Sequence, residues 1–118
     1  MVYLPKMLSQ AKSFLLDALL QKHKIADKRK VTKDYLTADV RSLFLRSGYT
    51  EKKLDQEKLD EMVEITLREL VKERYVEAHV GEWRKRAWIL DDVNQFRYYK
   101  LTSKGIEYAK LRRDTHWS

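Results

Sequence analysis

The chain has 118 residues, which suits one domain and leaves no room for a separate catalytic domain beside a modest core. Its composition is 43% apolar with only 3 glycines and 1 proline, which is typical of a helix-rich globular protein and excludes a long disordered linker. The absence of cysteine excludes disulfides, thiolate nucleophiles and zinc–thiolate sites, and the formal net charge of +7 favours polyanionic partners.

The first predicted element is a helix over residues 6–23. Apolar residues recur there at three-and-four spacing, as on the buried face of an amphipathic helix. Leu16 and Leu20 widen this face beyond what one small core usually needs. The width leaves two interpretations open: part of the face meets another subunit, or the helix is central and its own neighbours wrap it.

A second helix is predicted over residues 33–47, after a polar and basic connection. Thr32 precedes it and is a good N-cap residue, because its hydroxyl can accept a hydrogen bond from an otherwise unpaired backbone amide. Gly48 supplies the left-handed residue that ends it. The buried side carries four apolar residues at helical spacing: Leu36, Val40, Leu43 and Phe44.

A third helix is predicted from an N-cap at Asp55 to about residue 74. Together with the second helix and the connector between them it forms a helix-turn-helix candidate over residues 33–74. Its apolar stripe is almost uninterrupted: Leu59, Met62, Val63, Thr66, Leu67, Leu70 and Val71.

A β-hairpin is predicted over residues 75–101, in a sheet of two or three strands. Its first strand covers residues 75–80 and its partner strand residues 96–101. The tip lies either near residues 81–86, which open with a glycine, or near residues 91–94, and the sequence leaves this choice open.

A C-terminal helix is predicted over residues 103–113, with Thr102 as its N-cap and residues 115–118 as a frayed end.

Two segments resemble the PadR-like and MarR-like winged-helix regulators. The first covers residues 66–77, at the end of the third helix, and the second follows the hairpin: Tyr99-Lys100-Leu101-Thr102-Ser103-Lys104-Gly105. The resemblance implies a single winged helix-turn-helix domain over residues 1–118, mostly helical α+β, with a three-helix core, a β-hairpin wing and a C-terminal helix. It also implies a transcriptional regulator or a plasmid or phage DNA-binding protein, of a kind usually dimeric through the terminal helices, with Thr102 and Gly105 in structural roles.

The sequence departs from that pattern at three places. Arg74 stands where a glycine commonly ends the third helix, the connector over residues 48–55 is long, and the third helix is acidic.

Clusters of basic residues lie where a winged helix can touch phosphates, namely before the second helix, before the third helix and on the hairpin. The predicted contacts to double-stranded DNA are Lys28, Arg29, Lys30, Lys33, Lys52, Lys53, Arg84, Lys85 and Arg86. The resemblance assigns DNA contact to the last three of them. Duplex DNA is favoured over RNA because neither an aromatic ribonucleoprotein motif nor a GxxG loop is present.

The third helix argues for an alternative function. Carboxylates meet a strongly negative surface in a DNA groove, yet the first half of this helix is acidic. The alternative is a winged-helix protein-interaction module that docks through the acidic helix, on a protein partner or on a second copy of the chain. The acidic residues are Asp55, Glu57, Asp60, Glu61 and Glu64, against Lys58 alone.

Residues for catalysis are lacking. His23, His79 and His116 are scattered without metal-ligand spacing, and neither a phosphate-cradling glycine loop nor a nucleophile elbow occurs. Tyr98 and Tyr99 alternate across a strand, so one is expected in the core and one on the surface. The sequence therefore predicts a protein that is not an enzyme and that holds no cofactor or metal.

Membrane association is not expected. No apolar run approaches the roughly 20 residues of a membrane-spanning helix, and residues 1–8 lack the hydrophobic region of a signal peptide. The sequence predicts a cytoplasmic protein.

Overall fold

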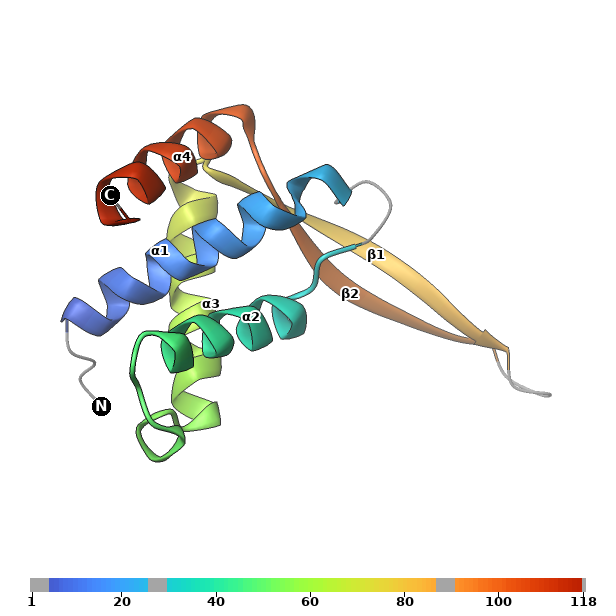
Figure 1. The fold of residues 1–118 in the computed structure, drawn as a ribbon. Coiled ribbons are helices and arrows are strands. Elements are labelled where there is room, and N and C mark those ends of the chain that lie inside the picture. The colour runs from blue at the N-terminus through green and yellow to red at the C-terminus, as the bar shows by residue number, and fades with distance from the viewer. Residues whose placement is uncertain (1–4, 26–29, 87–90, 118) are drawn as a thin grey trace.

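The computed structural model describes residues 5–25, 30–86 and 91–117, and the side chains of residues 6–24, 30–82 and 95–113. The two strands of this part of the chain form one antiparallel sheet, so the described chain is α+β and mostly helical, as predicted. Figure 1 shows the helices gathered into one body from which the hairpin extends to one side. The elements are α1 (Pro5–Lys22), the 3-10 helix η1 (His23–Ile25), α2 (Lys33–Arg46), the 3-10 helix η2 (Glu51–Lys53), α3 (Gln56–Lys72), β1 (Val76–Arg86), β2 (Asp91–Leu101) and α4 (Ser103–Trp117).

Helix α1 runs through the helical body and contacts α2, α3 and α4 (Figure 1). Its wide apolar face is covered within the chain, because Leu16 is 1% exposed and Leu20 is half-buried against the same core. Two interpretations of this face were open. The one in which neighbouring helices of the same chain cover α1 is confirmed for Leu16.

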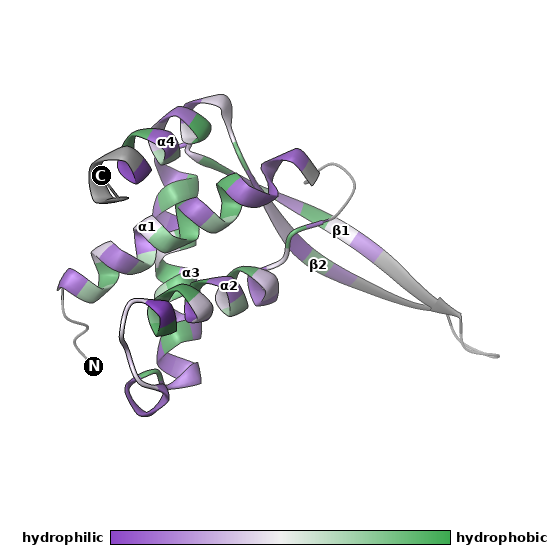
Figure 2. Cartoon of the chain, in the orientation of Figure 1, coloured by the Kyte–Doolittle hydropathy of each residue, from purple (hydrophilic) through white to green (hydrophobic). Residues whose placement is uncertain are grey.

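The core is one apolar cluster where the helices cross. Figure 2 shows apolar residues along α1 and α3 at this crossing and hydrophilic residues along the loop before α3. Phe44 of α2 is fully buried there, with its ring centroid 4.9 Å from that of Phe14 and 5.1 Å from that of Tyr49, both edge to face. The contact with Phe14 packs α2 against α1.

The predicted end of α2 at Gly48 is confirmed. Gly48 has a φ of 101°, in the left-handed region, and its amide donates to the carbonyl of Leu45. The amide of Tyr49 donates to the carbonyl of Phe44, which completes a Schellman motif.

Helix α3 ends in the same way but with an arginine at the left-handed position. Arg74 has a φ of 66°, and its amide donates to the carbonyl of Val71. The amide of Tyr75 donates to the carbonyl of Leu70. The departure noted in the sequence is therefore a real exception, a side chain placed where glycine is the usual residue.

The two N-caps behave differently. Asp55 caps α3 as predicted, because its carboxylate accepts a hydrogen bond of 3.0 Å from the amide of Glu57. Thr32 precedes α2, but the prediction that its hydroxyl caps this helix is wrong: the side chain makes no cap hydrogen bond. Its extended backbone instead forms an isolated bridge with Tyr98 of the hairpin.

The hairpin is longer than predicted. Its strands pair from Val76 opposite Leu101 to Arg86 opposite Asp91, so both predicted tip positions are wrong and the connection falls at residues 87–90, outside the described residues. Gly81 lies inside β1 opposite Phe96, where a Cβ atom would be 2.5 Å from the ring. Glycine occurs here because the ring of Phe96 packs closely against the backbone, and not because the chain turns.

The first turn of α4 is capped as predicted, because the hydroxyl of Thr102 accepts a hydrogen bond of 3.0 Å from the amide of Gly105. The helix continues to Trp117, so the predicted end at residue 113 and the frayed segment after it are wrong for residues 114–117. No glycine or proline follows Gly105 to stop the helix.

No helix among the described residues is long and apolar enough to cross a membrane.

Candidate nucleic-acid interface

The predicted contacts on the hairpin lie at the far end of β1. The backbone register places Arg84 opposite Val93, while Lys85 and Arg86 are opposite two aspartates, Asp92 and Asp91. Their side chains are outside the described residues, as are Lys28 and Arg29 altogether. The register itself shows that the far end of the hairpin carries both signs of charge, which lowers the electrostatic contribution expected of these three residues.

The predicted contacts Lys52 and Lys53 lie in η2, where both are exposed. This 3-10 helix precedes α3, whereas the hairpin follows it. Helix α3 has 17 residues, so at a rise of 1.5 Å per residue it separates the two lysines from the hairpin by roughly 25 Å. The structure does not bring these two lysines together with the other predicted contacts.

Lys30 lies against the hairpin. Its Nζ is 5.4 Å from the ring centroid of Phe96 and 5.3 Å from that of Tyr98, which favours a cation–π contact with both rings. Within the hairpin, Tyr98 also stacks on His79 of the paired strand, with ring centroids 5.2 Å apart. Tyr98 is therefore half-buried under Lys30. The predicted core residue of the two neighbouring tyrosines is Tyr99, which packs against the core, while Tyr98 is less exposed than predicted.

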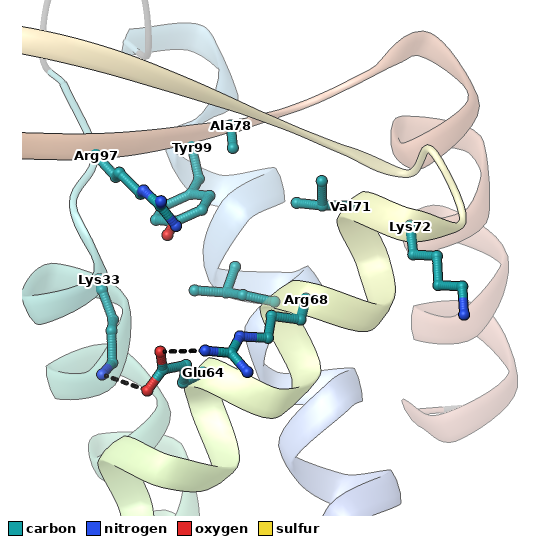
Figure 3. A pocket seen from close by; sticks show the side chains of 9 residues that line it. Lys33, Glu64, Arg68, Val71, Lys72, Ala78, Arg97 and Tyr99 are labelled. Atoms are coloured by element: carbon teal, nitrogen blue, oxygen red, sulfur yellow. Dashed lines mark hydrogen bonds and ion pairs between the residues drawn. The ribbon is translucent and has the colours of Figure 1, made fainter.

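Lys33 is the first residue of α2 and points toward α3. Its Nζ is 3.6 Å from the carboxylate of Glu64, which also accepts a hydrogen bond of 3.1 Å from Arg68 (Figure 3). Because these side chains are between a third and four fifths exposed, the ion pairs contribute little to folding. Their effect is local, since two cations neutralise the one carboxylate at this position.

Lys33 and Arg68 belong to a groove between α3 and the hairpin, with a volume of about 260 Å³. Figure 3 shows Arg97 and Tyr99 of β2 reaching from the hairpin toward α3, with Lys72 apart from the other cations at the far end. Four cations and one carboxylate line the groove, together with an apolar floor. The lining residues are Lys33, Glu64, Leu67, Arg68, Val71, Lys72, Ala78, Arg97 and Tyr99.

Strand pairing explains why the hairpin contributes these residues. Ala78 is opposite Tyr99, and directly paired residues of an antiparallel sheet share a face. Arg97 is two residues from Tyr99 and so lies on the same face, whereas Tyr98 lies on the other. The face toward α3 thus combines an aromatic ring with a guanidinium group.

Three of the groove cations, Arg68, Lys72 and Arg97, were not predicted as contacts. One signal was available: Glu64, Arg68 and Lys72 follow one another at intervals of four and therefore share one face of α3. The approach of Arg97 to that face depends on how the hairpin packs, and no local pattern indicates it.

The acidic residues of α3 differ in their surroundings. Glu64 is paired with two cations, Asp55 is engaged as the N-cap, and Asp60 accepts a hydrogen bond of 3.5 Å from Gln56. Glu57 and Glu61 are exposed in the first half of the helix. The face of α3 that lines the groove, with Arg68 and Lys72, is therefore the part suited to an anionic partner, whereas the exposed Glu69 lies outside the groove.

A metal centre is not formed by the part of the chain that the structure describes. His79 is 3.1 Å from the carboxylate of Glu77, but no third histidine or acidic residue joins them.

Comparison of the chain with protein-family models, with curated proteins and with solved structures finds no match. The arrangement of the groove and the order of the elements are the features from which a function can be inferred.

Proposed function

We propose that the chain is a non-catalytic DNA-binding protein with a winged-helix layout, acting in transcriptional control as a homodimer. In this layout α2 and α3 are the helix-turn-helix and β1 with β2 is the wing. The order of elements supports it, as does the bridge between Thr32, which lies just before α2, and Tyr98 of β2. That bridge occupies the place of a short third strand in the sheet.

The observation that carries the proposal is the cationic groove at the junction of α3 and the hairpin. Its four cations come from three separate elements, α2, α3 and β2, and its single carboxylate, Glu64, is paired twice. Phosphate binding by such a cluster is driven by release of the counterions condensed on DNA. Lys33 lies at the N-terminus of α2, where the positive end of the helix dipole also favours an anion.

We assign to the groove part of the phosphate binding that the sequence predicts for the far end of the hairpin. Lys85 and Arg86 face aspartates in register, whereas Arg68, Lys72 and Arg97 are opposed within the groove by Glu64 alone. We therefore expect the groove to contribute more of the salt dependence than the triplet Arg84, Lys85 and Arg86.

The test is fluorescence anisotropy of a labelled random-sequence duplex at several salt concentrations. Alanine at Arg68, Lys72 and Arg97 should lower the affinity and flatten the dependence of log K on log salt by up to about three units. Alanine at Arg84, Lys85 and Arg86 should flatten it less.

A matched control removes the same charge elsewhere. Lys6, Arg46 and Lys110 are exposed on α1, α2 and α4 and do not line the groove, so their replacement by alanine should leave the slope unchanged. Absence of binding by the unmodified protein even at low salt would refute the proposal.

The alternative from the sequence, docking of a protein partner through the acidic helix, is supported by the exposure of Glu57 and Glu61. Lysine at both positions should weaken such a partner, as measured by pull-down, while leaving DNA binding unchanged or stronger.

A further inference from the structure

The groove between α3 and the hairpin has a floor of a different chemistry from its rim. Leu67 is 2% exposed, and Val71, Ala78 and the ring of Tyr99 complete an apolar surface below the cations. Phosphates need the cations but gain nothing from an apolar floor. A ligand that uses both parts must carry a flat or apolar group beside its negative charge.

The size of the groove limits what that group can be. Its volume of about 260 Å³ lies just under the range of about 300 to 1,000 Å³ that small-molecule sites occupy. A stretch of paired duplex presents stacked bases and does not project a single group into such a hollow. One unpaired base does, because it can leave the stack and enter a pocket.

The carboxylate of Glu64 favours a base over a phosphate inside the groove. A phosphate diester offers a carboxylate no hydrogen-bond donor, whereas the edge of a base presents N–H groups from which the carboxylate can accept hydrogen bonds. Lys33 and Arg68 lie 3.6 and 3.1 Å from this carboxylate in the lining of the groove.

We propose that the groove binds one unpaired nucleotide, with its base on the apolar floor against the ring of Tyr99, its N–H groups toward Glu64, and its flanking phosphates near Lys33, Arg68 and Arg97. This inference rests on the proposed DNA-binding function and deepens it. The protein then prefers nucleic acid that contains an unpaired base over fully paired duplex.

Ala78 offers a variant that fills the pocket without changing charge. It is exposed, lies on β1 opposite Tyr99 and lines the groove, so Ala78→Leu occupies the space of the base. Ala78→Met does the same with a more adaptable side chain. Val80→Leu is the matched control, because Val80 is on the same face of the same strand, is 62% exposed and does not line the groove.

The experiment compares the affinity of the unmodified protein for three labelled duplexes by anisotropy at one salt concentration. They are a fully paired duplex, the same duplex with one bulged nucleotide, and the bulged duplex with an abasic residue in the bulge. The bulged duplex should bind about tenfold more tightly than the paired one, because stacking of one base on an aromatic surface has that magnitude, and the abasic residue should remove the gain.

The variants separate the pocket from the rest of the interface. Ala78→Leu and Ala78→Met should lose the preference for the bulge, so that bulged and paired duplexes bind alike, whereas Val80→Leu should keep the preference. Competition by a single-stranded oligonucleotide and by a free nucleoside monophosphate shows whether the unpaired base must belong to a duplex.

The outcomes distinguish this inference from the proposed function. Equal affinity for paired, bulged and abasic duplexes overturns the nucleotide pocket and leaves DNA binding intact. Binding of no nucleic acid overturns both. A preference for the bulge that survives in both Ala78 variants also overturns the pocket, because the base then lies elsewhere.

Discussion

At the scale of single residues, the two Schellman ends form a natural pair for comparison. Gly48 ends α2 and Arg74 ends α3, both with positive φ and the same backbone hydrogen bonds. An L side chain in the left-handed region costs about 1 to 2 kcal/mol, and glycine avoids this cost at the expense of a more flexible unfolded chain. The protein is therefore less stable with arginine at position 74 than it would be with glycine there.

Arg74→Gly should raise the free energy of unfolding by about 0.5 to 1 kcal/mol, because relief of the left-handed strain exceeds the entropic cost of glycine. Chemical denaturation measures it. Arg74→Ala is the control, since it removes the exposed side chain and keeps the strain, and it should leave the stability nearly unchanged. If glycine and alanine stabilise equally, the effect comes from the lost arginine charge and not from the backbone.

Gly48→Ala is the converse substitution. Its Cβ would meet no atom within 4 Å, so the only cost is the left-handed backbone at φ 101°. We expect a loss of about 1 kcal/mol in the free energy of unfolding, measured in the same denaturation experiment. A neutral result would mean that the end of α2 can change its conformation without affecting the core.

At the scale of elements, the junction of α3, β1 and α4 is held by a compact set of backbone contacts. The hydroxyl of Thr102 donates to the carbonyl of Arg74 at 2.8 Å, and the amide of Thr102 donates to the carbonyl of Tyr75 at 3.0 Å. Gly105 lies so close that a Cβ there would be 1.9 Å from the oxygen of Tyr75. The start of α4 is therefore fixed against the end of α3.

Gly105→Ala should lower the free energy of unfolding by about 3 kcal/mol, because the new methyl group meets backbone that these hydrogen bonds hold in place. Gly81→Ala is the contrast within the same chain. There the Cβ would be 2.5 Å from Cζ of Phe96, at the far end of a side chain that can swing away, so the loss should be about 1 kcal/mol. Thermal or chemical unfolding of both variants checks the order, and equal losses would contradict this account of the junction.

The elements also differ in how well the sequence predicts them. The stripe and cap of α3 were predictable because helical spacing and a capping carboxylate are local signals. The hairpin was misjudged because a glycine followed by basic residues is typical of a turn, while the reason for Gly81 is a ring 15 residues later in the chain. The groove was missed for the same reason, since Arg68 and Arg97 are brought together only by packing.

At the scale of the whole molecule, the two ends of the chain are joined by α1 and α4. The guanidinium of Arg112 on α4 donates to the hydroxyl of Ser13 at 2.8 Å and to the carbonyl of Ser9 at 3.4 Å, both on α1. Arg113 lies 3.6 Å from the carboxylate of Asp17, which is 8% exposed. These contacts span about a hundred residues of sequence and lie apart from the groove, which α2, α3 and the hairpin form.

Stability and binding should therefore be separable. Arg112→Met keeps the apolar stem of the side chain but removes its charged hydrogen bonds to α1, so it should lower the free energy of unfolding by about 1 to 3 kcal/mol and speed amide hydrogen exchange in α4 more than in α3. Ser13→Ala removes one of these bonds and should cost about 1 kcal/mol. The affinity for duplex DNA should stay unchanged in both variants under conditions in which they remain folded. If Arg112→Met weakens DNA binding while the protein is folded, the α1–α4 contact also shapes the groove, because the helical body that positions α3 then responds as one unit to a change at its far end.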